Sequence, residues 1–363
     1  MIIRRIIDAI EDFAPRALQE NYDNSGMQAG DAANDCTGAL LTLDVSERTV
    51  AEAAERGCNL IISHHPLLFK GVKSVTPSTK EGRILLDAIR RGVAIYAAHT
   101  SLDNARYGVS SRMAAKLGLS NVRPLCARQN GLMKIVVFVP ESAAESVRTA
   151  IADAGAGMIG DYDRCSYSMR GIGRYRANEG ARPFAGQVGC MHEEPEERIE
   201  AVVEGWRLGR VVEAMLAAHP YEEPAYDVIA LSNEDRHTGC GAVGNVEPIA
   251  YGAFLSKLKT IFGCPAVRCC GDLKATVRTV ALCGGSGAPM IADAVAAGAD
   301  VYVTGDVKYH DFTTFCDRIS IADIGHYESE QCAKEILADV IRSRVPEVAV
   351  YFAESDENVI KYI

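Results

Sequence analysis

Residues 50–65 read VAEAAERGCNLIISHH: an amphipathic helical pattern, a glycine, and then a short apolar run typical of a buried strand. Residues 291–306, IADAVAAGADVYVTGD, repeat this helix–glycine–strand order, and apolar strand positions fall opposite apolar ones. The identical pairs are Ala51 and Ala292, Ala53 and Ala294, and Gly57 and Gly298. Self-similarity of this kind favours a duplicated unit, so we expect the chain to hold two similar halves.

The sequence around both stretches continues the alternation of strands and helices. Apolar runs at 38–44 and 93–100 flank the first stretch, and amphipathic patterns at 46–57 and 81–92 lie between the runs. The same alternation returns between 276 and 326. Alternating strands and helices predict the α/β class, in which helices cover layered sheets.

The middle of the chain follows a different order. Between 129 and 237 the patterns run strand, helix, strand, strand, helix, strand, which is the ferredoxin-like order. Glycine- and charge-rich stretches, ARQNG and NEDRHTGCG, mark its two edges. We therefore predict that residues 1–128 and 238–363 form the two halves of one α/β core. Residues 129–237 are predicted to be an inserted ferredoxin-like α+β domain.

Composition and charge exclude several functional classes. The 363 residues carry a net charge of -10 without any run of Lys or Arg, which argues against general nucleic-acid binding. No stretch reaches the roughly 18 apolar residues of a membrane-spanning helix. Charges interrupt the N-terminal MIIRRIIDAIEDF, whose apolar residues follow the spacing of a helix with a core-facing stripe and not that of a signal peptide. The 12 cysteines include no C-x-x-C pair and are expected to be reduced thiols of a cytoplasmic protein without membrane contacts.

Histidines and carboxylates gather at the ends of the predicted core strands. His64 and His65 follow LIIS and precede Pro66, so two imidazoles can converge from one turn. His99 and Asp103 lie four residues apart directly after another predicted strand. Open α/β sheets place ligands at such strand ends. The structural alternatives are two hydrogen-bonded histidines in a turn and an aspartate that caps the next helix.

A third pair, His326 and Glu330, lies just past a predicted strand in IGHYESE. If a helix begins there, the two side chains share one face. The alternative for Glu330 taken alone is a first-turn glutamate that only stabilises the helix dipole. Together these strand ends offer five or six imidazole and carboxylate ligands, a set that suits zinc, manganese, iron or cobalt. That number exceeds the four of a closed zinc site and fits two metal ions about 3.5–4 Å apart with a bridging water.

Two glycine-rich segments and one further histidine carry weaker signals. GAGMIG at 155–160 matches the dinucleotide fingerprint in its letters, but it follows a helix instead of a strand and is rejected as a nucleotide site. CGGSG at 283–287 lies between a strand and a helix, where its backbone amides could hold an anion or make a tight turn. His219 ends a helix of the insert, and we expect it to belong to a turn at the end of that helix and not to bind a ligand.

The chain carries the motifs NYDNSGMQAGD (21–31), LIISHHPLLFKGVKSV (60–75), IYAAHTSLDNARYGVS (95–110), LCGGSG (282–287), DVYVTGDVKYHDF (300–312) and GHYESE (325–330). Together they resemble the Nif-three-like family of dinuclear-metal, hexameric proteins, whose members are commonly called GTP cyclohydrolase 1 type 2 homologues. The insert, with AAHPYEEPAYDVIAL (217–231), resembles the PII-like or copper-tolerance-protein-like domain of longer bacterial members. Departures from the family pattern are mild: Tyr22 stands where Trp is common, Ser25 where Val is common, and Ser101 where Asn is frequent.

This resemblance implies a set of metal ligands and an assembly. The implied ligands of two divalent metal ions are His64, His65, Asp103, His326 and Glu330. Glu330 would bridge the two ions. His99 would lie next to the ligands without binding metal itself, or would act as an occasional ligand. Glu330 and His99 are the residues expected to serve catalysis. Zinc is the favoured metal, with iron and manganese as alternatives, and the family implies a ring-like homohexamer whose metal sites face an internal cavity.

The expected function is that of a metal-dependent hydrolase acting on a nucleotide, with GTP ring opening supplied by the family name. A metal-bound hydroxide would attack C8 of the purine while the second metal or a nearby histidine handles protons. The alternative is a non-enzymatic hexameric scaffold or sensor, whose metals hold the structure and whose insert binds partners or small ligands. The expected partners are a small-molecule nucleotide and further copies of the chain.

Overall fold

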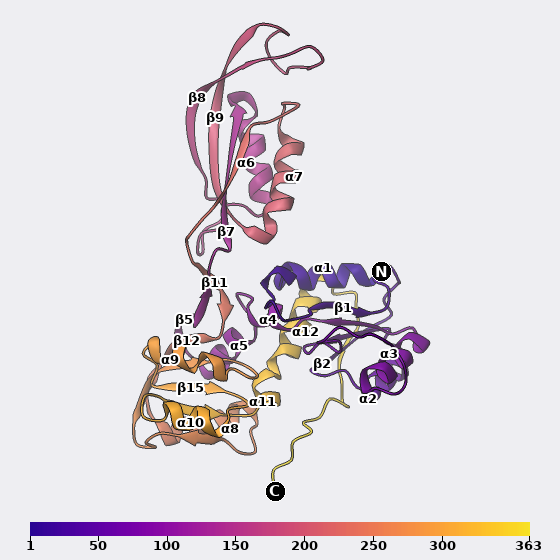
Figure 1. The fold of residues 1–363 in the computed structure, drawn as a ribbon, viewed down its shortest axis with the longest axis vertical. Coiled ribbons are helices and arrows are strands. Elements are labelled where there is room, and N and C mark those ends of the chain that lie inside the picture. Colours follow the sequence, from indigo (N-terminus) through magenta and orange to yellow (C-terminus); the bar gives the residue numbers. More distant parts are fainter. The chain divides into compact units, whose positions relative to one another are not determined.

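The chain forms two compact units in the computed structural model, which describes residues 1–363 (Figure 1). Met1–Ala127 and Arg236–Ile363 together make the first unit, and Arg128–Asp235 makes the second. The chain therefore begins the first unit, passes through the second, and then returns to complete the first.

A five-stranded sheet holds the first predicted strands, in the order β1-β4-β3-β2-β17. β2 (Ala39–Thr42), β3 (Leu60–Ser63) and β4 (Ala94–Ala97) run parallel and are buried along their whole length. β1 (Gly26–Ala29) pairs antiparallel with β4, and β17 (Val350–Phe352) pairs parallel with β2. The three parallel strands are apolar except for Thr42 and Ser63 at their ends, because a parallel sheet is covered on both faces.

Two amphipathic helices connect these parallel strands. α2 (Glu47–Glu55) follows β2, and α3 (Lys80–Arg91) precedes β4. Their apolar faces lie in one buried cluster with the sheet, in which Val50, Ile61 and Ile84 are fully buried. The alternation predicted for this part of the chain is therefore confirmed.

The second sheet has six strands in the order β13-β16-β15-β14-β12-β5. Its central strands β14 (Thr276–Leu282), β15 (Val301–Thr304) and β16 (Ser320–Asp323) run parallel. The other three, all antiparallel to their neighbours, are β5 (Ser120–Arg123), β12 (Ala242–Ala250) and β13 (Arg268–Cys270). The molecule is thus a mixed α/β protein with several sheets.

Each of these sheets takes an edge strand from the opposite end of the sequence. β5 precedes the middle segment of the chain but pairs with β12 in the second sheet, and β17 follows it but pairs with β2 in the first. In addition, α1 (Ile3–Phe13) packs against α12 (Cys332–Arg344). The predicted stripe of α1 is confirmed at its four isoleucines, Ile3, Ile6, Ile7 and Ile10, which are buried. The two halves are therefore interlocked within one unit.

The repeated stretches share one local conformation. α2 and β3 have their counterparts in α9 (Ile291–Ala296) and β15. The glycine between helix and strand has a φ of 71° in both copies, at Gly57 and at Gly298. A left-handed φ favours glycine because a Cβ would clash with the backbone. The same residue therefore turns the chain from helix to strand in both copies.

The second unit, Arg128–Asp235, is a four-stranded antiparallel sheet in the order β10-β7-β9-β8 with two helices. Its elements are β7 (Leu132–Pro140), α6 (Ala144–Asp153), β8 (Tyr167–Arg176), β9 (Met191–Glu204), α7 (Leu208–Ala218) and β10 (Tyr226–Ala230). The helices and the sheet share a buried core that includes Val137, Ile199 and Val211. The order of the elements is the strand–helix–strand–strand–helix–strand order expected from the sequence.

The remaining α-helices and strands are α4 (Thr100–Asp103), α5 (Val109–Leu117), α8 (Tyr251–Phe262), α10 (Tyr309–Phe315), α11 (His326–Glu330), β6 (Cys126–Arg128) and β11 (Asp235–Cys240). Among all the helices, none combines the length and the apolar character that crossing a membrane requires.

Candidate metal centre

The predicted ligands come from the ends of strands in both sheets. His64 and His65 follow β3, while His99 follows β4 and is succeeded by Asp103 at the end of α4. His326 and Glu330 begin and end α11, just past β16. Because β3, β4 and β16 are parallel strands whose carboxyl ends meet here, the fold brings these residues to one place.

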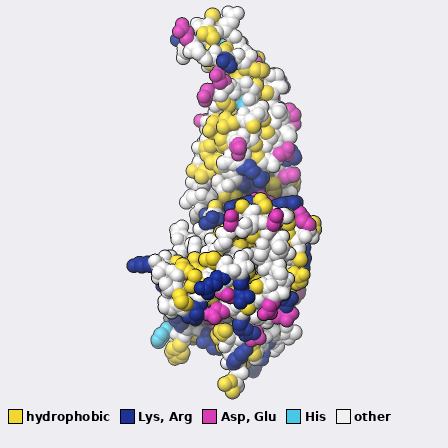
Figure 2. Space-filling model, turned by 90° about the vertical axis from the view of Figure 1, so that its right-hand side faces the viewer, with side chains coloured by type: hydrophobic (Ala, Val, Ile, Leu, Met, Phe, Trp, Pro, Cys, Tyr) yellow, Lys and Arg dark blue, Asp and Glu magenta, His cyan; other side chains and the backbone are white.

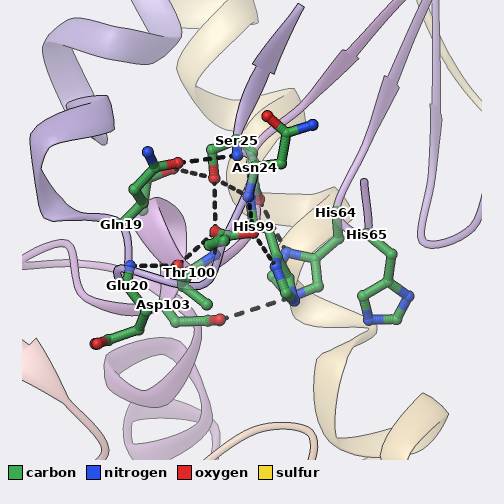
Figure 3. A network of polar contacts seen from close by, with 12 residues as sticks. Gln19, Glu20, Asn24, Ser25, His64, His65, His99, Thr100 and Asp103 are labelled. Atoms are coloured by element: carbon green, nitrogen blue, oxygen red, sulfur yellow. Dashed lines mark hydrogen bonds and ion pairs between the residues drawn. The ribbon is translucent and has the colours of Figure 1, made fainter. Parts of the chain in front are cut away.

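Glu330 lies at the middle of this cluster, with its side chain only 5% exposed. One carboxylate oxygen, Oε2, is 2.8 Å from Nε2 of His65 and 3.0 Å from Nε2 of His326. The other, Oε1, is 3.6 Å from Nε2 of His64. Asp103 approaches the same nitrogen of His64, again at 3.6 Å (Figure 3). The two oxygens of Glu330 therefore face two different groups of side chains.

Two atoms at this centre are buried without a hydrogen-bond partner: Nε2 of His64 and Oδ1 of Asp103. Buried polar atoms in proteins are nearly always paired, because leaving one unpaired costs about 1–3 kcal/mol. The two atoms face each other at a distance too long for a hydrogen bond. A cation between them would satisfy both, so the residues present fit a metal ion.

Two overlapping groups have ligand atoms within 4.8 Å of one another: His64 with His65 and His99, and His65 with His326 and Glu330. Asp103 belongs to neither group but lies 3.6 Å from Nε2 of His64. Imidazole nitrogens and carboxylate oxygens form a donor set that suits several first-row divalent metals. The cluster can therefore hold a metal ion.

In each of the four imidazoles, Nδ1 is hydrogen-bonded to an acceptor, while Nε2 lies on the opposite side of the ring. The acceptors are the Ala98 carbonyl for His64 (3.0 Å), Asp44 for His65 (3.0 Å), Asp23 for His99 (2.7 Å) and Asp306 for His326 (2.7 Å). Such an acceptor keeps a proton on Nδ1, so Nε2, which in His65 and His326 faces Glu330, is the nitrogen that a metal ion would occupy in place of a proton. The rings are thus oriented for coordination by the surrounding chain.

The three aspartates that hold these rings, Asp23, Asp44 and Asp306, were missed from the sequence. Asp44 and Asp306 each stand two residues beyond a strand, after β2 and β15, at the same sheet ends as the histidines. Their position just past the carboxyl ends of predicted strands was the sequence feature that could have identified Asp44 and Asp306 as part of the site. Asp23 also accepts hydrogen bonds from the backbone amide and the hydroxyl of Thr100.

The charges at the centre shift the pKa values of its members. Burial opposes protonation of His65, but its hydrogen bonds with Asp44 and Glu330 raise its pKa to about 10. Burial likewise opposes protonation of His326, and the contact with Glu330 raises its pKa to about 9. Burial acts to raise the pKa of Glu330, yet the surrounding imidazoles hold it well below its usual value. Glu330 is therefore a carboxylate.

Asp103 behaves differently from Glu330. Burial raises its pKa, although the neighbouring His64 acts in the opposite direction. A buried carboxyl group without a close cation favours its neutral form. A metal ion beside it would reverse this preference, because the ion supplies the positive charge that the protein does not.

The CGGSG segment makes a tight turn beside Glu330. The amide of Gly285 donates to Oγ of Ser329 at 2.9 Å, and the amide of Gly287 donates to Oγ1 of Thr304 at 3.0 Å. These amides are used within the protein, which favours the turn over the anion site. A Cβ on Gly285 would lie 2.1 Å from Oε1 of Glu330. The Glu330 carboxylate can therefore occupy its position only because residue 285 has no side chain.

The fold and the site define an α/β protein with a buried histidine–carboxylate cluster that can hold a metal ion. The chain belongs to the family described as Duf34/NIF3 (NGG1p interacting factor 3), whose model matches residues 1–359. The predicted membership of the Nif-three-like family is therefore confirmed.

Relatives and solved structures agree with this membership. The chain is 38% identical over 345 residues to a "GTP cyclohydrolase 1 type 2 homolog" of Halalkalibacterium halodurans, covering 93% of each chain. It is 35% identical over 367 residues to a protein of the same name from Bacillus subtilis, covering 99% of this chain and 98% of the relative. The crystal structure of a Bacillus cereus protein related to NIF3 superposes with a TM-score of 0.89 at 35% identity, covering 100% of this chain and 99% of that one.

Proposed function

We propose that this protein binds two divalent metal ions that share Glu330. His65 and His326 would hold one ion with Oε2 of Glu330, while His64 and Asp103 would hold the other with Oε1. The observation that carries this assignment is the pair of unpartnered buried atoms, Nε2 of His64 and Oδ1 of Asp103, on the side of Glu330 that His65 and His326 leave free. Zinc is the favoured metal, and iron and manganese are the alternatives.

We further propose that the centre hydrolyses a nucleotide, with ring opening of GTP as the leading reaction. Divalent cations at such a centre supply Lewis-acid chemistry and acidify water near neutral pH. The names of the curated relatives support GTP as the first substrate to test. His99 would exchange protons with the substrate, because Asp23 holds its Nδ1 and its ring lies 5.6 Å from that of His65 between centroids.

The direct test compares wild-type protein with Glu330→Gln after reconstitution with zinc, manganese or iron. Both are incubated with GTP and a panel of nucleotides, and the products are resolved by chromatography and mass spectrometry. A formamidopyrimidine or dihydroneopterin-type product from wild type alone is the expected result. Intact nucleotides with a wild type that holds its metals would overturn the hydrolase proposal. Metal analysis of the wild type is expected to give close to two ions per chain.

A second candidate function is that of a metal-dependent scaffold or sensor. The observation that favours it is a separate cavity of about 740 Å³ in the second unit, lined among others by Phe138, Glu196 and Tyr221. In this case Glu330→Gln would lower thermal stability or assembly, and no turnover would exist to lose. We propose a homohexamer in both cases, which native mass spectrometry of wild type and Glu330→Gln would check.

A further inference from the structure

A cavity of about 690 Å³ opens directly beside the candidate metal centre. His65, His99 and His326 line one part of it, and the segment 355–361 lines another. Its volume lies within the range of about 300–1,000 Å³ that is usual for small-molecule sites. The cavity therefore has both the position and the size of a substrate pocket.

The acidic side chains of this cavity are engaged by other protein groups. Asp44 is hydrogen-bonded to His65, and Glu357 lies 3.6 Å from Arg48. Asp356 forms an ion pair with Lys334 at 2.6 Å and also accepts a hydrogen bond from the Leu43 amide at 3.0 Å. These carboxylates thus contribute little uncompensated negative charge.

Two cationic side chains of the cavity, Lys80 and Lys361, form no ion pair. Elsewhere the charges are mixed: Figure 2 shows Lys and Arg side chains scattered among Asp and Glu on the face that it draws. The whole chain carries a net charge of -10, so two free ammonium groups in one cavity are a local feature and not a consequence of composition. They favour an anionic ligand.

The rest of the lining is largely apolar and aromatic. Val45, Pro66 and Phe69 line the cavity from the first half of the chain, and Ile360 lines it from segment 355–361. The Phe69 ring lies 6.1 Å from that of His99 between centroids, in an edge-on arrangement. Such a lining suits a flat ring. The cavity therefore combines a surface for a ring with cations for an anionic group.

Segment 355–361 is fixed at one end and open at the other. Glu52 accepts hydrogen bonds from the amides of Glu354 and Ser355, each at 2.9 Å, and Asn358 donates to Glu328 at 3.0 Å. Beyond these contacts Val359 is 91% exposed. Lys361 thus extends from an anchored segment and can reach a ligand without disturbing the sheet.

We propose that this cavity binds a small molecule that carries a ring and a phosphate, and that Lys80 and Lys361 hold the phosphate. Segment 355–361 is then a wall of the substrate pocket, and the two lysines determine specificity for the phosphorylated substrate. The inference rests on the proposed function in one respect, since it makes this ligand the substrate of the metal centre.

The test is a titration of metal-loaded, full-length protein by calorimetry with GTP, ATP, pyrophosphate and guanosine. The variants are Lys80→Gln and Lys361→Gln, and Lys73→Gln is the matched control because Lys73 is exposed and lies outside the cavity lining. Each cavity variant is expected to bind GTP about tenfold more weakly than wild type, whereas guanosine binding stays unchanged. Lys73→Gln is expected to bind every probe like wild type.

Several outcomes would overturn this inference. They are failure of wild type to bind any phosphate-bearing probe, equal affinity for GTP and guanosine, and equal weakening of GTP binding by Lys73→Gln. A chain ending at Asn358 must reproduce the loss seen with Lys361→Gln. The two proposals fail separately: lysine-dependent binding without turnover removes only the hydrolase, and turnover that is indifferent to both lysines removes only the phosphate site.

Discussion

At the scale of the residue, the centre depends on what stands behind each ligand. Asp44 and Asp306 hold His65 and His326 through Nδ1, whereas Glu330 contacts the same two rings through Nε2. Acceptors in this position orient a ligating ring and make its other nitrogen more basic. The stability of bound metal should therefore depend on residues that do not touch it.

Asp44→Asn and Asp306→Asn are each expected to weaken metal binding about 10–100-fold while leaving the fold intact. The reason is that an amide is a weaker and uncharged acceptor for the imidazole N–H. Competition of each variant with a chelator measures the affinity. Asp317→Asn is the control, because Asp317 is exposed and precedes β16, whereas His326 and Glu330 follow the carboxyl end of that strand. An affinity equal to that of this control would show that the aspartates do not orient the rings.

Gly285→Ala is expected to lose metal binding by displacing the Glu330 carboxylate, because the new Cβ would lie 2.1 Å from Oε1. Gly57→Ala is the matched control: its φ of 71° resembles the 63° of Gly285, but nothing lies within 4 Å of its Cβ. Both substitutions place alanine in left-handed backbone, which costs about 1–2 kcal/mol. Metal analysis should therefore find bound metal in Gly57→Ala but not in Gly285→Ala. Equal metal content in the two variants would contradict the prediction.

His219 is predicted to make the second unit less stable in acid. Burial lowers its pKa below 6.5, although its hydrogen bond to the Phe138 carbonyl acts in the opposite direction. The unfolded chain therefore binds more protons as the pH falls through this range, and the free energy of unfolding falls with it. Above about pH 6.5 the contribution of His219 is complete and stability should level off.

Trp206 is the only tryptophan and lies in η3 (Gly205–Arg207) of the second unit, so its fluorescence reports unfolding of that unit. Urea titrations between pH 5 and 8 measure the slope of stability with pH. His219→Gln removes the titrating imidazole and should flatten this slope. An unchanged slope would mean that other groups cause the acid sensitivity.

At the scale of the element, the exchange of edge strands joins the two sheets. β5 and β17 each pair with a sheet built mainly from the opposite end of the sequence, and α12 contacts α1, α5, β2 and β17. Because α5 in turn contacts β12 and β14 of the second sheet, α12 is linked to both sheets. The two sheets of the first unit should therefore unfold together.

Ile341→Ala in α12 is expected to lower the unfolding free energy of the first unit by about 2–5 kcal/mol, because Ile341 is fully buried. Ile89→Ala, at a helix position that is 61% exposed, is the control and should change stability by less than about 0.5 kcal/mol. Amide exchange then tests the coupling. Faster exchange in only one of the two sheets would show that they unfold separately.

At the scale of the whole molecule, one unit contains the candidate centre and the other contains none of its residues. A ligand that binds only the folded form stabilises the part it binds. Removing metal should therefore lower the stability of the first unit alone.

Thermal unfolding before and after chelation provides this test. Circular dichroism follows both units, whereas Trp206 fluorescence follows the second. Chelation should lower the midpoint of the dichroism transition of the first unit and leave the Trp206 midpoint in place. A shift of both midpoints by the same amount would mean that the units unfold as one, or that metal binds elsewhere.

The sequence by itself determined the family, the central strands and helices of both halves, and the histidines and carboxylates of the candidate cluster, but not the strands β5, β12, β13 and β17. Amphipathic periodicity fixed the α2–β3 repeat and the buried face of α1, because burial of apolar side chains imposes a period on the sequence. His64, His65 and the pair His326 and Glu330 stood out because each follows a strand, where parallel sheets leave side chains free to meet.

Only the tertiary structure decided which partners these residues have. The exchange of β5 and β17, the aspartates behind the imidazoles and the lysines of the cavity all join positions far apart in the chain. Local periodicity does not contain such pairings, since they arise from the packing of whole sheets against each other. For the same physical reason, the choice between a turn and an anion site at CGGSG needed the neighbouring Ser329 and Thr304, which the fold places within reach of its amides.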